Sequence, residues 1–181
     1  MTASPWTLQC AACAYTASGA GLASLCPDCG QPLAVHLAPV SRSRIGTDAS
    51  MWRYHAAMPI LENEHRVALG EGMTPLIELP HIAKELGVRR LWVKDEGVNP
   101  TASFKARGLA MAVTRAKALG LAGVCVPTAG NAGIALAAYA AAARLPARIY
   151  APATTPPPIL GSIRAFGAQL ELVDGHIGDA G

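Results

Sequence analysis

The chain has 181 residues, enough for one ordinary domain and a small appendage but too few for two large domains. Hydrophobic residues make up 51% and charged residues 15%, a balance that excludes a disordered chain and predicts a substantial buried core. The 15 Lys and Arg residues exceed the 12 Asp and Glu residues by a net charge of +3, which is too small and too scattered to indicate nucleic-acid binding.

The N-terminal sequence shows no targeting signal. It reads MTASPWTLQC, without a basic region and a following apolar run, and the longest apolar stretch, 132–143, is shorter than a bilayer crossing. We therefore expect neither a signal peptide nor a membrane span, no membrane partner, and a cytoplasmic location.

The cysteine distribution separates an N-terminal segment, residues 1–38, from the rest of the chain. Cys10 and Cys13 form one CxxC pair, Cys26 and Cys29 form a second, and twelve residues separate the two pairs. This spacing brings four thiolates together at the tips of two facing turns, the arrangement that tetrahedral Zn²⁺ prefers. We predict a Cys₄ zinc ribbon whose closed ligand shell has a structural role.

Other uses of these cysteines stay open at this point. The same thiolates could hold iron, and two disulfides or simple buried thiols are further alternatives, although the expected reducing compartment favours a metal. His36 is a weaker candidate ligand nearby. Cys125 lies within an apolar strand, and we predict that it is a core residue.

The rest of the chain divides into a connector and an α/β domain. Residues 39–73 show no sustained period and one short helical pattern around 48–58, so we interpret them as a connector with a surface helix. Over 74–181, short apolar runs alternate with longer helical patterns, which is typical of βαβ units and predicts a parallel sheet. The expected strands are 90–94, 123–127, 148–151 and 169–173, and the expected helices are 103–119, 131–145 and 157–166.

Lys105 is a candidate catalytic residue. It follows Ser103, a candidate N-cap, near the start of the expected helix 103–119. The positive end of the helix dipole disfavours a charged amine there, and a neutral amine can form a Schiff base with an aldehyde. Spacing alone leaves open an ordinary solvent-exposed lysine. Arg107, Arg115 and Lys117 fall on the side of this helix opposite the apolar stripe.

A second polar turn follows the expected strand 123–127. It reads TAGNAG over residues 128–133 and precedes an Ala-rich helix. Free backbone N–H groups meet the positive end of a helix dipole there, so an anionic group would bind well. A plain βα turn with Asn131 as N-cap is the alternative, since the segment contains neither GxGxxG nor a P-loop.

Four segments together resemble a known enzyme family. They are KDEGVNPTASFKARG at 94–108, PTAGNAG at 127–133, LGEGMTPL at 69–76 and VDGHIGDAG at the C-terminus. These segments resemble the threonine synthases, within the fold-type II (tryptophan synthase β-like) enzymes that depend on pyridoxal 5′-phosphate. The resemblance implies a three-layer α/β fold with a parallel sheet, and some members also carry a cysteine ribbon ahead of the catalytic domain.

The resemblance also implies roles for residues of the cofactor site. Lys105 would bond to pyridoxal phosphate, Asn131 would donate a hydrogen bond to the cofactor's phenolic oxygen, and Phe104 would help to position the ring.

The substrate would be held beside the cofactor. By the same resemblance, the backbone of Thr128, Ala129 and Gly130 would take the substrate carboxylate, and Thr74 and Glu96 would shape the site.

The chain departs from the family pattern in three respects. Ala102 stands where members often have Gly, and Ala106 stands where many have Asp. The family also continues into a second half with a Gly-rich loop for the cofactor phosphate and a polar residue facing the pyridine nitrogen. Nothing after Gly133 resembles either feature, so we interpret the chain as the N-terminal part of such an enzyme, apparently truncated.

The activity that the resemblance implies is conversion of O-phospho-L-homoserine and water to L-threonine and phosphate. A small amino-acid substrate is then the expected partner, together with a homo-oligomer or a chain that supplies the second half. A serine/threonine dehydratase or related ammonia-lyase of the same fold is the alternative enzyme. A catalytically inactive zinc-ribbon remnant is the alternative from another class, favoured by the missing phosphate loop.

Overall fold

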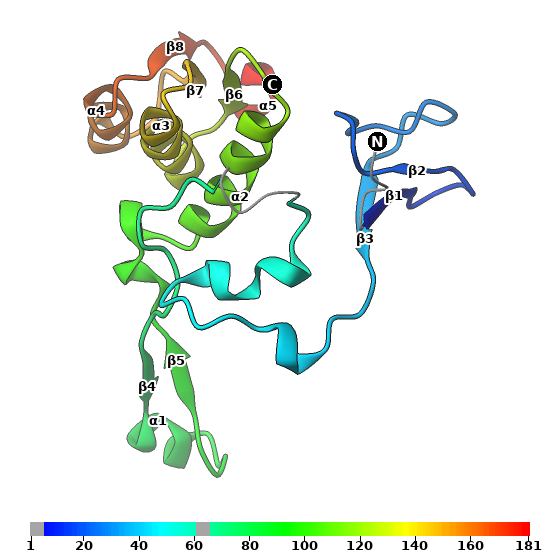
Figure 1. The fold of residues 1–181 in the computed structure, drawn as a ribbon. Helices are drawn as coiled ribbons and strands as arrows, with labels where there is room; N and C mark the ends of the chain where they lie inside the picture. The colour runs from blue at the N-terminus through cyan, green and yellow to red at the C-terminus, as the bar shows by residue number, and fades with distance from the viewer. Residues whose placement is uncertain (1–5, 61–65) are drawn as a thin grey trace.

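The computed structural model describes residues 6–60 and 66–181 (Figure 1). The described strands form a three-stranded sheet of β1–β3, a two-stranded sheet of β4 and β5, and a three-stranded sheet of β6–β8. No described helix combines the length and the apolar character that crossing a membrane requires.

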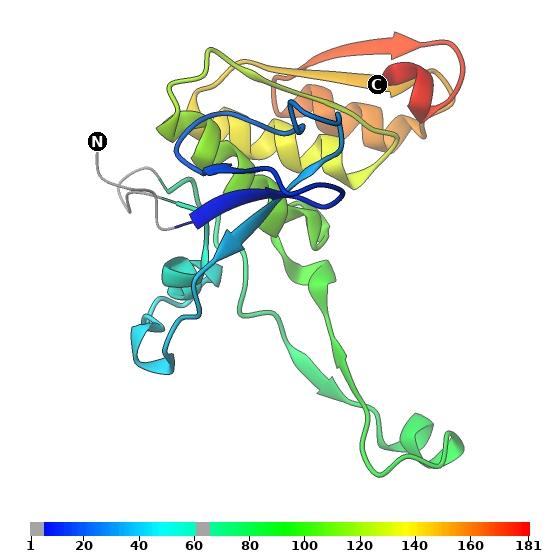
Figure 2. The ribbon, with the colours of Figure 1, turned by 90° about the vertical axis from the view of Figure 1, so that its right-hand side faces the viewer.

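The N-terminal segment is a small antiparallel ribbon. Its strands are β1 (Trp6–Cys10), β2 (Thr16–Ser18) and β3 (Leu33–Leu37), in the order β2-β1-β3. Alternation along β1 buries Trp6 and Leu8 on one face. Figure 2 shows the ribbon in front of the helices of the α/β part.

The connector contributes to the core. It contains the short 3₁₀ helices η1 (Arg42–Arg44) and η2 (Met51–Ala57). Met51 and Trp52 are buried in the same hydrophobic cluster as helices of the α/β part. Tyr54 and Ala57 of the same helix remain exposed, so η2 lies at the surface and is anchored to the core through Met51 and Trp52.

A two-stranded arm projects from the body in both views (Figures 1 and 2). It consists of β4 (Leu76–Glu78), helix α1 (Pro80–Glu85) and β5 (Trp92–Lys94). β5 corresponds to the expected strand 90–94, but it pairs antiparallel with β4 and is not part of the parallel sheet. The expectation of one sheet is corrected here.

The parallel sheet has the order β6-β7-β8. In the register, Cys125 lies opposite Arg148, and Arg148 lies opposite Gln169. Of the residues in β7, Ile149 and Ala151 are fully buried. After β5, the chain forms in order η4 (Glu96–Val98), η5 (Pro100–Ala102), α2 (Lys105–Ala118), β6 (Val124–Pro127), α3 (Asn131–Ala143), β7 (Ala147–Pro152), α4 (Pro157–Ala165), β8 (Gln169–Val173) and α5 (Ile177–Ala180).

Small side chains let the elements of the core approach one another closely. Helix α3 packs against α2, α4, β6 and β7, and Ala residues make up most of its buried positions. Gly133 is required for this approach, since a Cβ there would lie 2.6 Å from Thr128 and 3.0 Å from Ile163. The predicted tight packing of the Ala-rich helix is confirmed. This packing fixes the loop before α3 against the sheet.

Candidate functional site

Lys105 is the first residue of α2, as the sequence predicts. Its side chain is half-buried, and its Nζ lies 4.6 Å from the centre of the exposed Phe104 ring. Ser103 is buried, and its hydroxyl accepts a hydrogen bond of 3.3 Å from the Lys105 N–H. Among residues 6–60 and 66–181, no carboxylate forms an ion pair with the Lys105 amine, which leaves the amine available for chemistry.

Arg107, two residues beyond Lys105, forms a polar network with Glu96 of η4 and with Thr74 in the loop before β4. Arg107 donates from Nε to Glu96 at 2.6 Å and from Nη2 to the other carboxylate oxygen at 2.8 Å. The Thr74 hydroxyl donates to Glu96 at 2.6 Å. Arg107, on the side of α2 opposite the apolar stripe, thus has Glu96 as a bidentate partner. Thr74 and Glu96, to which the resemblance gives a role in shaping the site, are in direct contact here.

Asn99 extends this network to the backbone. Its Nδ2 donates to Glu96 at 2.8 Å, and its Oδ1 accepts from the Gly72 N–H at 3.1 Å. Lys94 donates to the Thr74 carbonyl. Gly72 has a φ of +106°, and a Cβ there would lie 2.4 Å from the backbone N of Met51. Only glycine fits this turn, which holds the 72–74 loop against the start of α2.

The turn that delivers the chain to Lys105 has unusual backbone angles. Thr101 and Ala102 have φ values of +65° and +53°, in the left-handed region that non-glycine residues rarely adopt. The Thr101 hydroxyl is buried with no hydrogen-bond partner in the part of the chain that the structure describes. Ala102 stands where the family that the chain resembles often has Gly. It adopts the left-handed backbone conformation that glycine favours. Strain of this kind is typical of functional sites.

The Glu96 carboxylate gives the fold a predictable response to acid. Hydrogen bonds from Arg107 lower the pKa of Glu96 from 4.5 to about 2, with smaller contributions from Thr74 and Asn99. A carboxyl group whose pKa falls on folding adds stability above its unfolded pKa, and that stability is lost as the pH falls through the folded pKa. We therefore expect the stability difference between wild type and Glu96→Gln to be full above about pH 4.5 and to vanish near pH 2.

Urea unfolding at pH 6, 4, 3 and 2 measures this difference. The exposed pair of Glu78 and Arg90 provides a matched control, because Glu78→Gln should change the unfolding free energy by less than about 0.5 kcal/mol at every pH. A stability difference for Glu96→Gln that stays constant from pH 6 to pH 2 would contradict the pairing with Arg107.

The loop between β6 and α3 offers fewer free N–H groups than expected. The Thr128 N–H donates to the Tyr150 carbonyl at 2.9 Å, and the Gly130 N–H donates to the Thr128 hydroxyl at 3.1 Å. Gly130 is the N-cap and Asn131 the first helical residue, with an exposed side chain. The N–H of the exposed Ala129 and the first N–H groups of α3 remain as the donors for an anion, since a helix's first turn lacks internal acceptors.

A buried carboxylate that the sequence reasoning missed supports the site. Glu71 is completely buried and accepts from Trp52 Nε1 at 2.6 Å, from the Tyr139 hydroxyl at 2.6 Å and from the Leu69 N–H at 2.9 Å. Burial, together with the bond to Glu71, raises the pKa of Tyr139, so the phenol stays protonated and donates. Glu71 thus joins η2, α3 and the loop that leads to Thr74.

The four N-terminal cysteines converge at one end of the ribbon. Their Sγ atoms all lie within 4.8 Å of one another, and the closest pairs are Cys10–Cys29 at 3.4 Å and Cys13–Cys26 at 3.6 Å. Zn–S bonds of about 2.3 Å in a tetrahedron require S···S separations of about 3.8 Å. The cluster could therefore hold a metal ion.

The environment of these thiols also suits a metal. The Ala12 N–H donates to Cys10 Sγ at 3.3 Å and lowers the pKa of this thiol to about 7, which favours the thiolate that a metal binds. Although backbone bonds at Tyr15 and Gln31 lower them, hydrogen bonds with the neighbouring thiols raise the pKa of Cys13 to about 12 and that of Cys29, so without a cation the cluster does not hold four thiolates. His36 is not part of the cluster found among the described residues. Cys125 is exposed on the sheet, so the expectation that it is a core residue is wrong.

Comparisons with known proteins agree with this geometry. Residues 67–181 match the family described as pyridoxal-phosphate dependent enzyme. The threonine synthase of Methanosarcina acetivorans is 37% identical over 134 residues, which cover 72% of this chain and 32% of that protein. The threonine synthase of a Synechocystis species is 39% identical over 141 residues, 74% of this chain and 37% of that protein. The chain thus spans about a third of the length of these curated relatives.

Solved structures show the same fold. The crystal structure of O-ureido-L-serine synthase is 34% identical with a TM-score of 0.53, over 66% of this chain and 38% of that one. Diaminopropionate ammonia lyase from Escherichia coli is 25% identical with a TM-score of 0.57, over 64% of this chain and 37% of that one. With the family match covering most of its length, the chain belongs to the pyridoxal-phosphate dependent enzyme family.

Proposed function

We propose that this chain forms the lysine-bearing part of a threonine synthase, which converts O-phospho-L-homoserine and water to L-threonine and phosphate. The observation that carries the proposal is Lys105 at the first position of α2, whose amine has no carboxylate partner among residues 6–60 and 66–181. It stands two positions before Arg107 of the Thr74–Glu96–Arg107 network. The threonine synthases of Methanosarcina acetivorans and Synechocystis are relatives that support this reaction.

The residues present fit pyridoxal phosphate. When bound, the cofactor supplies an electron sink for negative charge at the substrate Cα. Lys105 would hold it through the amine and, once released, would remove the Cα proton as a general base. Phe104 would flank the ring and Asn131 would donate to its phenolic oxygen.

The substrate carboxylate would bind at the turn before α3. The Ala129 N–H, the Thr128 hydroxyl and the first N–H groups of α3 form the donor set, with the helix dipole favouring negative charge. Gly130, the N-cap of α3, contributes to this turn through its backbone conformation, which directs the chain into the helix. The rest of the cofactor site would come from a second half of the fold, supplied by another chain or within a homo-oligomer.

A substrate-protection experiment tests the reaction class without requiring repeated turnover. A substrate amine that takes the place of Lys105 on the cofactor protects this lysine from borohydride labelling, so O-phospho-L-homoserine should protect at least tenfold better than L-serine or L-threonine. Phosphate release should exceed keto-acid formation when protein is in excess. Stronger protection by serine or threonine, with keto acid as the product, would favour a dehydratase instead.

An ammonia-lyase of the same fold is the second candidate, favoured by the structural similarity to diaminopropionate ammonia lyase. It would eliminate the β-substituent and release ammonia, so ammonia formation from a diamino acid substrate distinguishes it from threonine synthase.

We also propose that the cysteine cluster holds one structural Zn²⁺ through Cys10, Cys13, Cys26 and Cys29, in a reduced, cytoplasmic protein. Protein prepared without chelator should contain about one zinc per chain by elemental analysis. Cys26→Ser should lower the zinc content at least tenfold without unfolding the α/β domain, and Cys125→Ser, a matched change outside the cluster, should leave it unchanged. Iron in place of zinc, or protein without metal, would contradict this assignment.

A further inference from the structure

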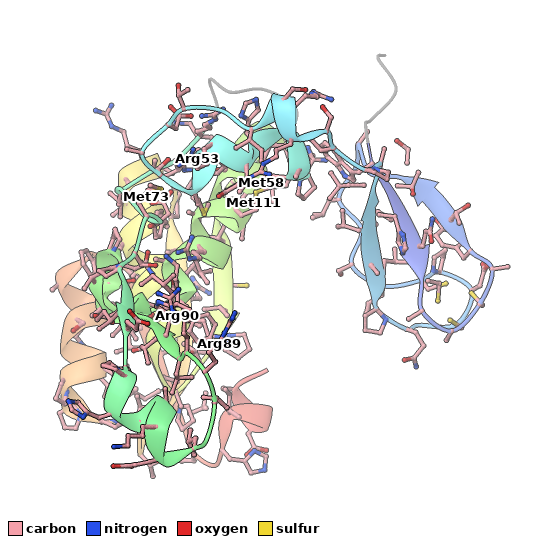
Figure 3. The ribbon with its side chains drawn as sticks, turned by 90° about the horizontal axis from the view of Figure 1, so that it is seen from below. Arg53, Met58, Met73, Arg89, Arg90 and Met111 are labelled. Atoms are coloured by element: carbon pink, nitrogen blue, oxygen red, sulfur yellow. The ribbon has the colours of Figure 1, made fainter. Side chains whose placement is uncertain are left out.

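A cavity of about 290 Å³ lies between the ribbon and helix α2, away from the residues proposed for the cofactor. Most of its lining is apolar. The ribbon contributes Trp6, Leu22 and Val35, and α2 contributes Met111 and Leu119. Met111, labelled in Figure 3 with Met58, also packs against the core cluster.

One charged side chain lines this cavity. Arg115 reaches from α2 to the ribbon, where its Nη2 donates to the carbonyls of Gly19 at 2.7 Å and Ala20 at 2.8 Å. Its guanidinium lies 5.1 Å from the centre of the Trp6 ring. Arg115, on the side of α2 opposite the apolar stripe, thus joins the ribbon to this helix.

The charge of Arg115 has no counterion among the residues that the structure describes. Its Nη1 is buried and has no hydrogen-bond partner, and no carboxylate pairs with it within residues 6–60 and 66–181. Carbonyl oxygens and an aromatic face stabilise a guanidinium only in part, and burial without an anion lowers the pKa of Arg115. Buried charges in proteins are normally paired, since an unpaired charge loses its hydration without compensation.

The rim of the cavity exposes apolar side chains to solvent. Leu22 is 73% exposed and Val35 is 45% exposed, so apolar side chains meet solvent beside an uncompensated cation. A single occupant would satisfy both features if it combined a carboxylate with an apolar body. Pockets of this kind, apolar with one fixed polar group, are typical of small-molecule sites.

We propose that the ribbon–α2 cavity is a binding site for a small carboxylic acid with an apolar tail. The carboxylate pairs with the guanidinium of Arg115, which lines the cavity, and the tail lies against Trp6, Leu22 and Met111. An α-ammonium group would bring a second cation close to the guanidinium, so unsubstituted acids bind better than the corresponding amino acids. The site is independent of the cofactor and of the reaction proposed above.

Calorimetric titration of the metal-loaded chain with 4-methylpentanoate tests the proposal. We expect one site per chain and binding at least tenfold tighter than that of 4-methylpentanamide, acetate or L-leucine. Shifts of the Trp6 indole N–H resonance in NMR spectra would locate the ligand. Equal binding of the acid and the amide, equal binding of acetate, or no binding would overturn the proposal.

Two variants separate the charge from the cavity. Arg115→Gln should weaken 4-methylpentanoate binding at least tenfold, whereas Arg148→Gln, at an exposed arginine of the sheet, should not change it. Ala112→Leu fills the cavity from an exposed position on α2 and should also abolish binding while Arg115 and the zinc content are retained. Unchanged binding in Ala112→Leu would place the ligand elsewhere.

Discussion

Borohydride reduction in the presence of pyridoxal phosphate is expected to attach the cofactor to Lys105 and to leave Lys84, Lys94 and Lys117 essentially unmodified. Lys105 alone combines a position at the start of α2, a half-buried side chain and a neighbouring aromatic ring. Lys84 and Lys117 are exposed, and the amine of Lys94 donates to the Thr74 carbonyl. Peptide mapping of the reduced protein measures the distribution of the label.

Variants on the same helix give this experiment its control. Lys105→Arg keeps the positive charge but cannot form an imine, so we expect labelling to fall at least a hundredfold and any turnover to be lost. Lys117→Arg, twelve positions along α2, should leave both unchanged. Label on another lysine while Lys105 stays unmodified would contradict the assignment and the proposed function with it.

The long elements of the α/β part could be predicted from sequence. Helix α3 and strand β7 were expected within two residues of their observed bounds, because an unbroken Ala-rich run and a short run around Ile149 and Tyr150 leave few alternatives. The four cysteines were also predictable, since CxxC spacing brings ligand atoms together almost independently of the remaining fold.

The arm was not predictable in the same way. Strands β4 and β5 have three residues each, and both are exposed along their length, so no alternation of buried and exposed positions marks them. Their pairing depends on where the chain turns around α1, which a period in the sequence does not encode. The expectation of a single sheet failed here for that reason.

The partners of the α2 arginines could not be predicted for a different reason. Arg107 and Arg115 lie on the polar side of the helix, and polar sides normally face water. In the structure Arg107 finds Glu96, and Arg115 finds the backbone of the ribbon. Partners distant in sequence decide the environment of a charged side chain, and periodicity contains no information about them.

Glu71 is the clearest example of a charged residue whose environment cannot be predicted from the sequence. Within LGEGMTPL, a glutamate between two glycines is compatible with an exposed turn, and only the structure shows three donors around it. The donors come from η2, from α3 and from the turn itself. A buried carboxylate surrounded in this way indicates that the loop before Thr74 is held rigidly in place.

Replacing Glu71 with leucine should destabilise the fold by about 3–5 kcal/mol, because the buried donors of Trp52 and Tyr139 would lose their acceptor. Glu71→Gln keeps one acceptor oxygen but places an amide N–H₂ against a donor, so its expected cost is about 2 kcal/mol. Urea unfolding at pH 7 measures both changes, with an unchanged m-value showing that two-state behaviour is retained.

The matched control is Glu78→Leu, at a glutamate that is 45% exposed and paired only with Arg90, where the cost should stay below about 1 kcal/mol. A Glu71→Leu cost no larger than that of Glu78→Leu would show that the buried bonds add nothing to stability. The effect should also reach the site, since Glu71 and Thr74 belong to the same loop. Cofactor labelling of Lys105 should therefore decrease in Glu71→Gln even at temperatures where the variant remains folded, because Thr74 would no longer hold Glu96 and Arg107 beside the start of α2.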